Sequence, residues 1–393
     1  MKFLLTLLLF FSLKTFAQKD SCHISISILT CTPGELLYST FGHSAIRVTD
    51  SVSHSDIVYN YGTFNFDEPG FYTKFIRGKL NFYISTEEFD SFIYEYEEDG
   101  RGVIEQTLNL TCSEKRNIIT LLKANMIGAD KFYKYDFTFD NCTTRLRDLL
   151  NKAADSSVNF SRVVHGRKTF RDLIYEYLNY NDKQWSKLGI DILLGSPMDA
   201  VMQPREVMFL PDYLMKTFDS SRIGSRPLVK YKQQIEPLNL PPVVVDYFTH
   251  PFFVFTCVFL LVVFLSFIKN NFIKRLLGAF DGFMFFITGL LGILLIFMWF
   301  GTEHLMTKDN FNLLWAWPTN AIAAFFVYSK NKTVNNYFFI YSVFNLTLFG
   351  CWFFLPQHMN PALMPIIAIL IFRSLFYISR GKNVTDETNH FWK

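Results

Sequence analysis

The sequence predicts an α+β front domain followed by an all-α membrane domain, and three observations support this order. The chain holds 38 Lys/Arg and 35 Asp/Glu, but residues 251–393 contain only 10 and 5 of them. That rear part has five apolar stretches of about the length of a spanning helix. The front part mixes strand-like and helix-like patterns. A disordered chain, a small disulfide-held protein and a uniformly soluble enzyme are therefore excluded.

The N-terminus has the pattern of a secretory signal peptide. Lys2 precedes an apolar run over residues 3–13, and Thr15-Phe16-Ala17 supplies small residues at the positions a signal peptidase reads. The apolar run is too short to span a bilayer comfortably, which disfavours an uncleaved anchor. We expect residues 1–17 to be removed, with cleavage after Ala17.

The front domain is expected over residues 18–240, with a proline-rich linker over 241–250. Alternating apolar and polar residues predict strands, and apolar residues at helical spacing predict helices. The expected strands are 24–30, 44–49, 57–62, 103–110 and 133–139; the expected helices are 86–96, 113–125 and 142–152, with a mostly helical stretch over 166–219. This mixed order, with few crossover helices, predicts the α+β class.

The rear domain is expected over residues 251–380, with a tail over 381–393. The predicted spans are 251–268, 279–300, 311–329, 336–355 and 361–379. Lysine and arginine concentrate in the first and third loops and the tail, whereas the second and fourth loops carry only Lys308. The positive-inside rule places the C-terminus in the cytoplasm and the front domain outside. Arg373, near the cytoplasmic end of the last span, is expected to extend to the interface.

Cys142 is the first candidate for chemistry. It follows Asp140-Asn141 and opens an amphipathic helix, where the helix dipole favours the reactive thiolate. Cys22, Cys31 and Cys112 also lie in the exported part, and two disulfides are an equally simple interpretation of four cysteines. Cys31 is the strongest rival nucleophile, although it ends a strand and fits a structural role better.

A nucleophilic cysteine needs a base, and His43 is the leading candidate. It stands in Phe41-Gly42-His43-Ser44, where a glycine turn leads directly into a strand. The front part is slightly acidic with scattered basic residues, which argues against nucleic-acid binding. No metal-ligand spacing, phosphate-binding glycine loop or nucleotide fingerprint is present in the sequence, so we expect no cofactor.

A histidine at the mouth of an early strand, followed later by Asn-Cys opening a helix, resembles the circularly permuted papain-like fold. Permuted NlpC/P60 enzymes and lecithin:retinol acyltransferase share that fold. More specifically, the chain resembles the Lnb family of bacterial lipoprotein N-acyltransferases. The segments that carry this resemblance are 29–35, Phe41-Gly42-His43-Ser44, 59–64, 75–80, Tyr135–Asp148, Gly301-Thr302-Glu303-His304 and Asn310–Trp317.

The resemblance implies a periplasmic permuted papain-like domain and a five-helix domain in the inner membrane. It also implies acyl transfer from a membrane phospholipid to the α-amino group of a lipoprotein's diacylglyceryl-cysteine. Cys142 would attack the phospholipid ester while His43 takes its proton, and the lipoprotein amine would then attack the thioester. The expected partners are a phospholipid donor, a diacylated lipoprotein acceptor and the bilayer.

Further site residues carry open alternatives. Asn60 could orient His43, or simply bond to backbone. The backbone N–H groups of Cys142 and Thr143 could form an oxyanion hole. Basic side chains could hold a lipid phosphate, or could be solvated interfacial residues. Arg77 and Lys79 are the candidates for this last role, and Arg47, next to the His43 strand, is equally ambiguous. His304, on an exterior loop, could contribute to substrate binding or be a simple interfacial residue.

Two other functions keep parts of this interpretation. A membrane-anchored thiol hydrolase, either a phospholipase or a cell-wall amidase, would use the same cysteine and histidine with water as acceptor. A membrane receptor or assembly factor would use the papain-like shape without catalysis.

Overall fold

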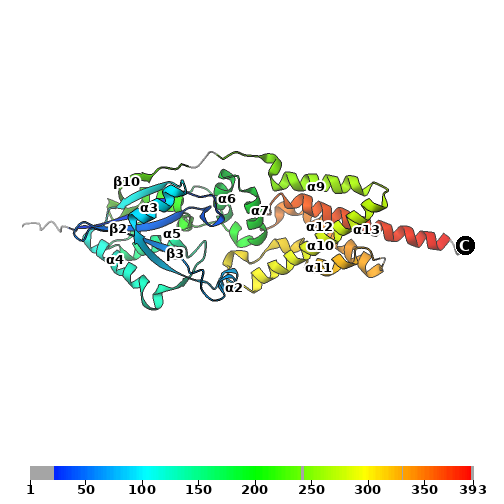
Figure 1. Cartoon of the computed structure of the whole chain (residues 1–393), viewed down its shortest axis with the longest axis horizontal. Coiled ribbons are helices and arrows are strands. Elements are labelled where there is room, and N and C mark those ends of the chain that lie inside the picture. The colour runs from blue at the N-terminus through cyan, green and yellow to red at the C-terminus, as the bar shows by residue number, and fades with distance from the viewer. Residues whose placement is uncertain (1–21, 240–242, 330, 391–393) are drawn as a thin grey trace, which may run out of the picture.

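The computed structural model describes residues 22–239, 243–329 and 331–390 (Figure 1). The predicted signal peptide, residues 1–17, lies outside the described residues. A front domain built on a β-sheet occupies one end of the molecule, and a bundle of helices occupies the other. The predicted order of an α+β domain followed by a helical domain is confirmed.

The front domain is organised around a seven-stranded sheet whose order is β10-β5-β1-β2-β3-β4-β6. Each neighbouring pair is antiparallel, as expected when strands are joined by hairpins rather than by crossover helices. The strands are β1 (Ile24–Cys31), β2 (His43–Asp50), β3 (Ser55–Thr63), β4 (Asn81–Glu88), β5 (Val103–Leu108), β6 (Tyr133–Lys134) and β10 (Val229–Glu236). A small sheet joins β7 (Val158–Asn159), β8 (Arg222–Ile223) and β9 (Arg226–Pro227).

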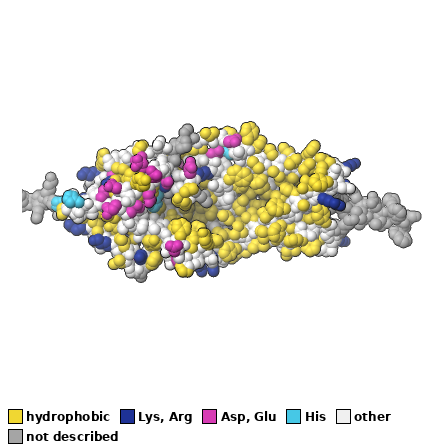
Figure 2. Space-filling view, viewed as in Figure 1, with side chains coloured by type: hydrophobic (Ala, Val, Ile, Leu, Met, Phe, Trp, Pro, Cys, Tyr) yellow, Lys and Arg dark blue, Asp and Glu magenta, His cyan; other side chains and the backbone are white. Residues whose placement is uncertain are grey.

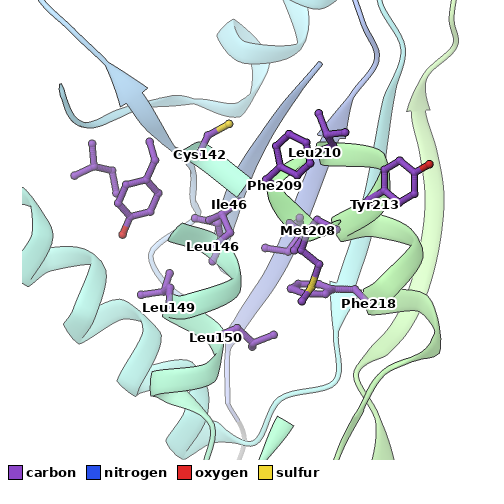
Figure 3. Close-up of a cluster of buried hydrophobic side chains, with 14 of the residues drawn as sticks. Ile46, Cys142, Leu146, Leu149, Leu150, Met208, Phe209, Leu210, Tyr213 and Phe218 are labelled. Carbon is purple, nitrogen blue, oxygen red and sulfur yellow. The ribbon is translucent and has the colours of Figure 1, made fainter. Parts of the chain in front are cut away.

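The helices of the front domain are α2 (Phe71–Ile76), α3 (Phe89–Glu98), α4 (Cys112–Met126), α5 (Cys142–Ala153), α6 (Phe170–Tyr180), α7 (Gln184–Leu193) and α8 (Pro211–Ser220). Alternation along the strands gives the sheet two apolar faces. Ile46 of β2 belongs to the main core with α4, α5 and α8, whereas Ala45 faces the smaller core under α3. Figure 3 shows the main core around α5.

Several strands differ from the sequence prediction. β4 covers residues that were predicted partly as the start of a helix, and α3 begins only at Phe89. β10 was not predicted, because its exposed edge position leaves it with several polar side chains and little apolar alternation. The predicted strand over 133–139 shortens to β6, and the chain then turns back through the Asp136–Asp140 bridge.

The rear domain contains α9 (Pro251–Ser266), α10 (Asn271–Phe300), α12 (Lys332–Gly350) and α13 (Leu363–His390). In the described part of the chain, α10 is the one helix whose length and apolar composition would allow it to cross a membrane. Pro251–Ser266 and Leu363–Tyr377 are shorter apolar helices. The third predicted span, 311–329, is not a continuous helix: it consists of 3-10 turns and the short α11 (Asn320–Ala323). Five continuous spanning helices are therefore not confirmed.

The third segment packs very close to α10. A Cβ on Gly292 would overlap the Ala316 carbonyl, and a Cβ on Gly289 would overlap the backbone of Ala321. Irregular backbone in an apolar environment needs partners for its polar groups. The Trp315 carbonyl accepts a hydrogen bond of 2.7 Å from the Tyr341 hydroxyl of α12. Small residues on α10 therefore allow the irregular segment to approach closely, and a polar side chain on α12 bonds one of its free carbonyls.

Arg373 does not extend to the interface as predicted. Its side chain is 2% exposed and pairs with Asp281, with Nε donating to Oδ1 over 2.8 Å. Its Nη1 also donates to the Ser266 hydroxyl over 2.7 Å. A buried guanidinium without a carboxylate would be very costly, and the pairing offsets part of that cost. The three residues connect α9, α10 and α13.

The two domains meet at the C-terminal end of α7. The last carbonyls of a helix lack partners within the helix. Here the Asn310 amide donates to the Ile192 carbonyl over 2.8 Å, and the Asn312 amide donates to the Asp191 carbonyl over 2.9 Å. The Asp191 carboxylate is fully buried and pairs with Arg171, at 2.6 Å, and with the Asn360 amide, at 2.8 Å. Loops of the rear domain thus cap a helix of the front domain.

Candidate active site

The N-terminus of α5 is held by Asn141. Its Oδ1 accepts hydrogen bonds from the N–H groups of Thr143 and Thr144, at 2.9 and 2.8 Å, as an N-cap residue does. Its Nδ2 donates to the carbonyls of Phe137 and Phe209, at 2.7 and 2.8 Å. Cys142 is therefore fixed in the first turn, above the apolar face of α5 that packs into the core (Figure 3). Its side chain remains 7% exposed.

The turn before β2 places His43 near the N-terminus of α5. Gly42 has a φ of +78°, which side-chain-bearing residues rarely adopt, and a Cβ there would lie 2.6 Å from the Cys31 carbonyl oxygen. The glycine lets the chain reverse tightly between β1 and β2. His43 then pairs with Cys31 at the first position of the strand. This position brings the imidazole to the N-terminal end of α5, where it hydrogen-bonds to Cys142.

Asn60 and Glu87 fix which imidazole nitrogen faces the thiol. Asn60 Nδ2 donates to Glu87 Oε1 over 2.7 Å, and a carboxylate can only accept. Asn60 Oδ1 therefore faces His43 Nε2, 3.1 Å away, and the Nε2 atom carries the hydrogen. The remaining nitrogen, Nδ1, is left for Cys142. Glu87 was not among the residues predicted from the sequence.

The electrostatics favour a charged cysteine–histidine pair. Burial raises the pKa of the Cys142 thiol, but the His43 charge, hydrogen bonds from His43 and the Ser44 N–H, and the Thr143 hydroxyl outweigh it. The result is a pKa lowered from its ordinary value to about 7. Burial lowers the pKa of His43, but the Cys142 charge and hydrogen bonds with Cys142 and Asn60 raise it overall. Such a pair presents a thiolate near neutral pH.

Comparison with known families identifies both halves of the chain. Residues 13–176 match the Lnb N-terminal periplasmic domain, and residues 244–383 match the Lnb transmembrane domain. The chain belongs to the Lnb family. No curated protein and no solved structure matches it. The resemblance noted in the sequence is confirmed, and this Lnb protein is a membrane protein with a periplasmic N-terminal domain.

Cys31, the rival nucleophile in this Lnb protein, is not suited to attack. Its side chain is fully buried, and burial raises its pKa to about 12 despite a hydrogen bond with Tyr96. It therefore remains a protonated thiol on β1, directly opposite His43 in the sheet. Among the described residues, no disulfide involves Cys22, Cys31 or Cys142. The interpretation of four exported cysteines as two disulfides is wrong.

Tyr135 is a site residue that the sequence reasoning missed. Its hydroxyl hydrogen-bonds to Cys142, and burial together with the Cys142 charge holds its pKa well above its usual range. Its ring packs on Phe82 with 4.8 Å between centroids. The segment 133–139 was interpreted as a strand, and only the turn at Asp136–Asp140 brings Tyr135 back to the thiol. No local pattern in the sequence signals that contact.

The backbone N–H of Thr143 is not available as predicted. It donates to Asn141 Oδ1, so it caps the helix rather than facing a substrate. Within the described part of the chain, the Cys142 N–H has no hydrogen-bond acceptor. The oxyanion-hole prediction is therefore compatible with the geometry for the Cys142 N–H and contradicted for the Thr143 N–H.

Arg47 is held by partners within the front domain. Its Nε and Nη2 atoms bind the Asp56 carboxylate at 2.7 and 2.5 Å, and Nη1 binds Glu105 at 3.1 Å. The guanidinium also lies 3.3 Å from the centroid of the Phe89 ring on α3. All three guanidinium nitrogen atoms therefore have carboxylate partners, which contradicts the predicted substrate-binding role.

The periplasmic domain touches the loop after α10, and this contact brings together Arg77, Lys79 and His304. His304 Nε2 lies 3.0 Å from the Ile76 carbonyl oxygen, and Arg77 Nε donates to the Gly301 carbonyl over 3.4 Å. Lys79 Nζ lies 3.5 Å from Glu303 Oε1. These contacts place the three residues at the membrane side of the domain, and their role in substrate binding stays a prediction.

Proposed function

We propose that this protein is a lipoprotein N-acyltransferase that moves an acyl chain from a phospholipid to the α-amino group of a diacylglyceryl-cysteine. The observation that carries the proposal is the Cys142–His43 pair, oriented by Asn60 and Glu87, in the periplasmic domain of an Lnb family member. We assign the domain to the permuted papain-like fold, because His43 precedes Cys142 in the chain whereas papain has the reverse order.

In the first step, the Cys142 thiolate attacks the carbonyl carbon of a glycerol ester in the donor phospholipid. The tetrahedral intermediate collapses as the ester C–O bond breaks, and His43 gives its proton to the departing glycerol oxygen. The products are a Cys142 thioester and a lysophospholipid. Dividing the transfer into two steps in this way is the usual gain from a covalent nucleophile.

In the second step, the lipoprotein's α-amino group attacks the thioester carbonyl. His43, now neutral, accepts the proton that the amine loses, and the C–S bond breaks to regenerate the Cys142 thiolate beside imidazolium. An amide bond replaces the thioester. Water has to be excluded during the lifetime of the thioester, and the aromatic surroundings of Tyr135 and Phe82 support that exclusion.

The oxyanion of both intermediates needs hydrogen-bond donors that are already in position. The Cys142 N–H, at the positive end of α5, is one donor. The Tyr135 hydroxyl is the second, because it already contacts the sulfur atom that forms the new bond. Removing one such donor typically costs about 10²- to 10³-fold in kcat, so we expect Tyr135→Phe to lower turnover by that order.

The proposed reaction also requires an orientation in the membrane. Both lipid substrates are available at the outer leaflet of the inner membrane, which faces the periplasm. We therefore propose that the C-terminus is cytoplasmic, as the distribution of Lys and Arg in the loops indicates. Lipid would then approach Cys142 from the side of the domain that touches the loop after α10.

The test uses the full-length protein in phospholipid nanodiscs with a synthetic diacylated lipopeptide. We expect N-acylated lipopeptide and an equal amount of lysophospholipid, with an acyl adduct on Cys142 visible by intact mass when the lipopeptide is omitted. Cys142→Ala should give neither product nor adduct. Free fatty acid without N-acylated peptide would instead identify a hydrolase, and full activity of Cys142→Ala would contradict the nucleophile.

A further inference from the structure

The connection between β3 and β4, residues 64–80, presents an unusual number of large apolar side chains to its surroundings. Phe66 is 71% exposed and Tyr72 is 77% exposed, and about half of Phe75 and of Ile76 is exposed as well. They come from α2 and the turn before it. Soluble surfaces rarely gather apolar side chains in this way unless a partner covers them.

The position of the β3–β4 connection indicates what that partner is. The N–H of Glu303 donates to the Arg77 carbonyl over 2.9 Å, and His304 Nε2 lies 3.0 Å from the Ile76 carbonyl. These loop residues follow directly after Phe300, the last residue of the apolar helix α10. The exposed side chains are therefore held close to the level at which α10 leaves the membrane, as Figure 1 shows for α2 and α10.

The chemistry of the connection is that of the membrane interface. Figure 2 shows hydrophobic surface continuing from the helical domain onto the adjoining corner of the front domain. Aromatic rings and basic side chains together are typical of segments that lie among lipid headgroups. Lys74 pairs with Glu68 and Lys79 lies near Glu303, so the local charge is largely balanced. The apolar side chains, rather than net charge, therefore dominate the expected contact.

The connection is also continuous with the candidate active site. Phe71 packs on Phe64 with 5.7 Å between ring centroids, Phe64 on Phe82 with 5.3 Å, and Phe82 on Tyr135 with 4.8 Å. Tyr135 hydrogen-bonds to Cys142. An unbroken series of aromatic contacts thus leads from the exposed surface to the residue beside the thiol.

We propose that the β3–β4 connection inserts Phe66, Tyr72 and Phe75 into the headgroup layer of the outer leaflet. The occupant of this surface is lipid, and the connection holds the candidate active site close to the bilayer. The lipid contact itself stands apart from the proposed acyl transfer. Its use as the route by which the donor reaches Cys142 rests on that proposed function.

The test is site-specific photo-crosslinking of the full-length protein in nanodiscs of phosphatidylethanolamine and phosphatidylglycerol. Benzoylphenylalanine replaces Phe66 or Tyr72, and the matched control replaces Tyr94, an aromatic residue of α3 that is 61% exposed. We expect lipid adducts, detected by peptide mass, at positions 66 and 72 at several times the level at position 94. Equal yields at the three positions would overturn the proposal.

Two further arms separate lipid from other occupants and from catalysis. Addition of diacylated lipopeptide tests the alternative that the surface binds the acceptor protein; adducts to the peptide chain in place of lipid would overturn the lipid assignment. Repeating the experiment in Cys142→Ala makes the result independent of turnover. Retained lipid adducts in that variant support the proposal even if no transferase activity is found in the wild type.

Discussion

At the scale of single residues, the state of one thiol depends on groups from four separate elements. Cys142 lies at the start of α5, His43 begins β2, Asn60 belongs to β3 and Glu87 to β4. The Glu87 carboxylate fixes the Asn60 amide, and the amide in turn fixes the imidazole. Glu87 thus acts on the thiol through two intermediate side chains, and it is a positioning residue rather than a catalytic one.

Changes at Glu87 should affect the orientation of His43 without removing it. Glu87→Ala leaves the Asn60 amide free to rotate, and misplacement of a catalytic group by about 1 Å costs on the order of 10²-fold in rate. We expect kcat of acyl transfer to fall by about 10- to 10²-fold. Glu87→Gln keeps an acceptor oxygen for Asn60 and should retain most of the activity. Equal losses in both variants would show that the negative charge matters instead.

The pH dependence of Cys142 alkylation should report the charged pair directly. The pKa of the thiol is lowered to about 7, so its reaction with iodoacetamide, followed by peptide mass, should rise through about pH 7. In His43→Ala the lowering cation is gone, and only the hydrogen bonds from the Ser44 N–H and the Thr143 hydroxyl still oppose burial. The midpoint should therefore move upward, from about 7 towards the ordinary thiol value of 9.0. An unchanged midpoint would mean that His43 does not contact the thiolate.

At the scale of elements, the site depends on how a helix and a strand begin. Asn141 ends the preceding turn and caps α5, while Gly42 allows the chain to enter β2 at His43. Both residues act on the backbone next to them, and both could be recognised in the sequence. They explain why the proximity of Cys142 and His43 could be predicted although the two residues are far apart in the chain.

Loss of the α5 cap should cost stability and disturb the thiol together. Asn141→Ala removes an N-cap, which typically lowers the free energy of unfolding by about 1–2 kcal/mol, and also leaves two carbonyls without a donor. Thr111→Ala removes the cap of α4 and is the matched control. We expect both variants to unfold at lower temperature in detergent, and only Asn141→Ala to shift the alkylation midpoint of Cys142. An equal shift in Thr111→Ala would argue against a local effect.

The limits of prediction from sequence also lie at this scale. The proximity of Cys142, His43 and Asn60 could be predicted because capping residues, glycine turns and alternation are local signals. Tyr135 and Glu87 could not, because their contacts depend on a turn and on a strand pairing across the sheet. Arg47 was misjudged for the same reason, since its partners come from β3 and β5.

At the scale of the whole molecule, the junction fixes the periplasmic domain on the membrane domain. Amides from two membrane-domain loops bind carbonyls at the end of α7, and Gly195 N donates to the Met306 carbonyl over 2.8 Å. Gly195 lies so close to Lys308 that a Cβ there would overlap its carbonyl. The lack of a side chain is therefore a requirement of the domain contact.

A single methyl group should be enough to loosen this junction. In Gly195→Ala the two backbones have to separate, so we expect faster hydrogen exchange around residues 191–195 and 310–314. The proposed acyl transfer from bilayer phospholipid should fall on the order of 10-fold to 10²-fold, because the site loses its position relative to the lipid. The alkylation midpoint of Cys142 should not change.

Gly189→Ala provides the control, because a Cβ at Gly189 would meet no atom within 4 Å. This variant should exchange hydrogen and transfer acyl chains as the wild type does. If Gly195→Ala also behaves as the wild type, the two domains do not need the tight junction for activity.

The broken third segment of the membrane domain has a consequence for how the chain is made. A regular apolar helix bonds its own backbone and can leave the translocon for lipid by itself. The segment 311–329 cannot, because the Trp315 carbonyl depends on Tyr341 of α12 and the backbone depends on the glycine face of α10. In a nascent chain that ends before α12, the Trp315 carbonyl therefore lacks the hydrogen-bond donor that stabilises this segment in the membrane. Integration should be delayed until α12 has been synthesised, and the segment should then enter together with its two neighbours.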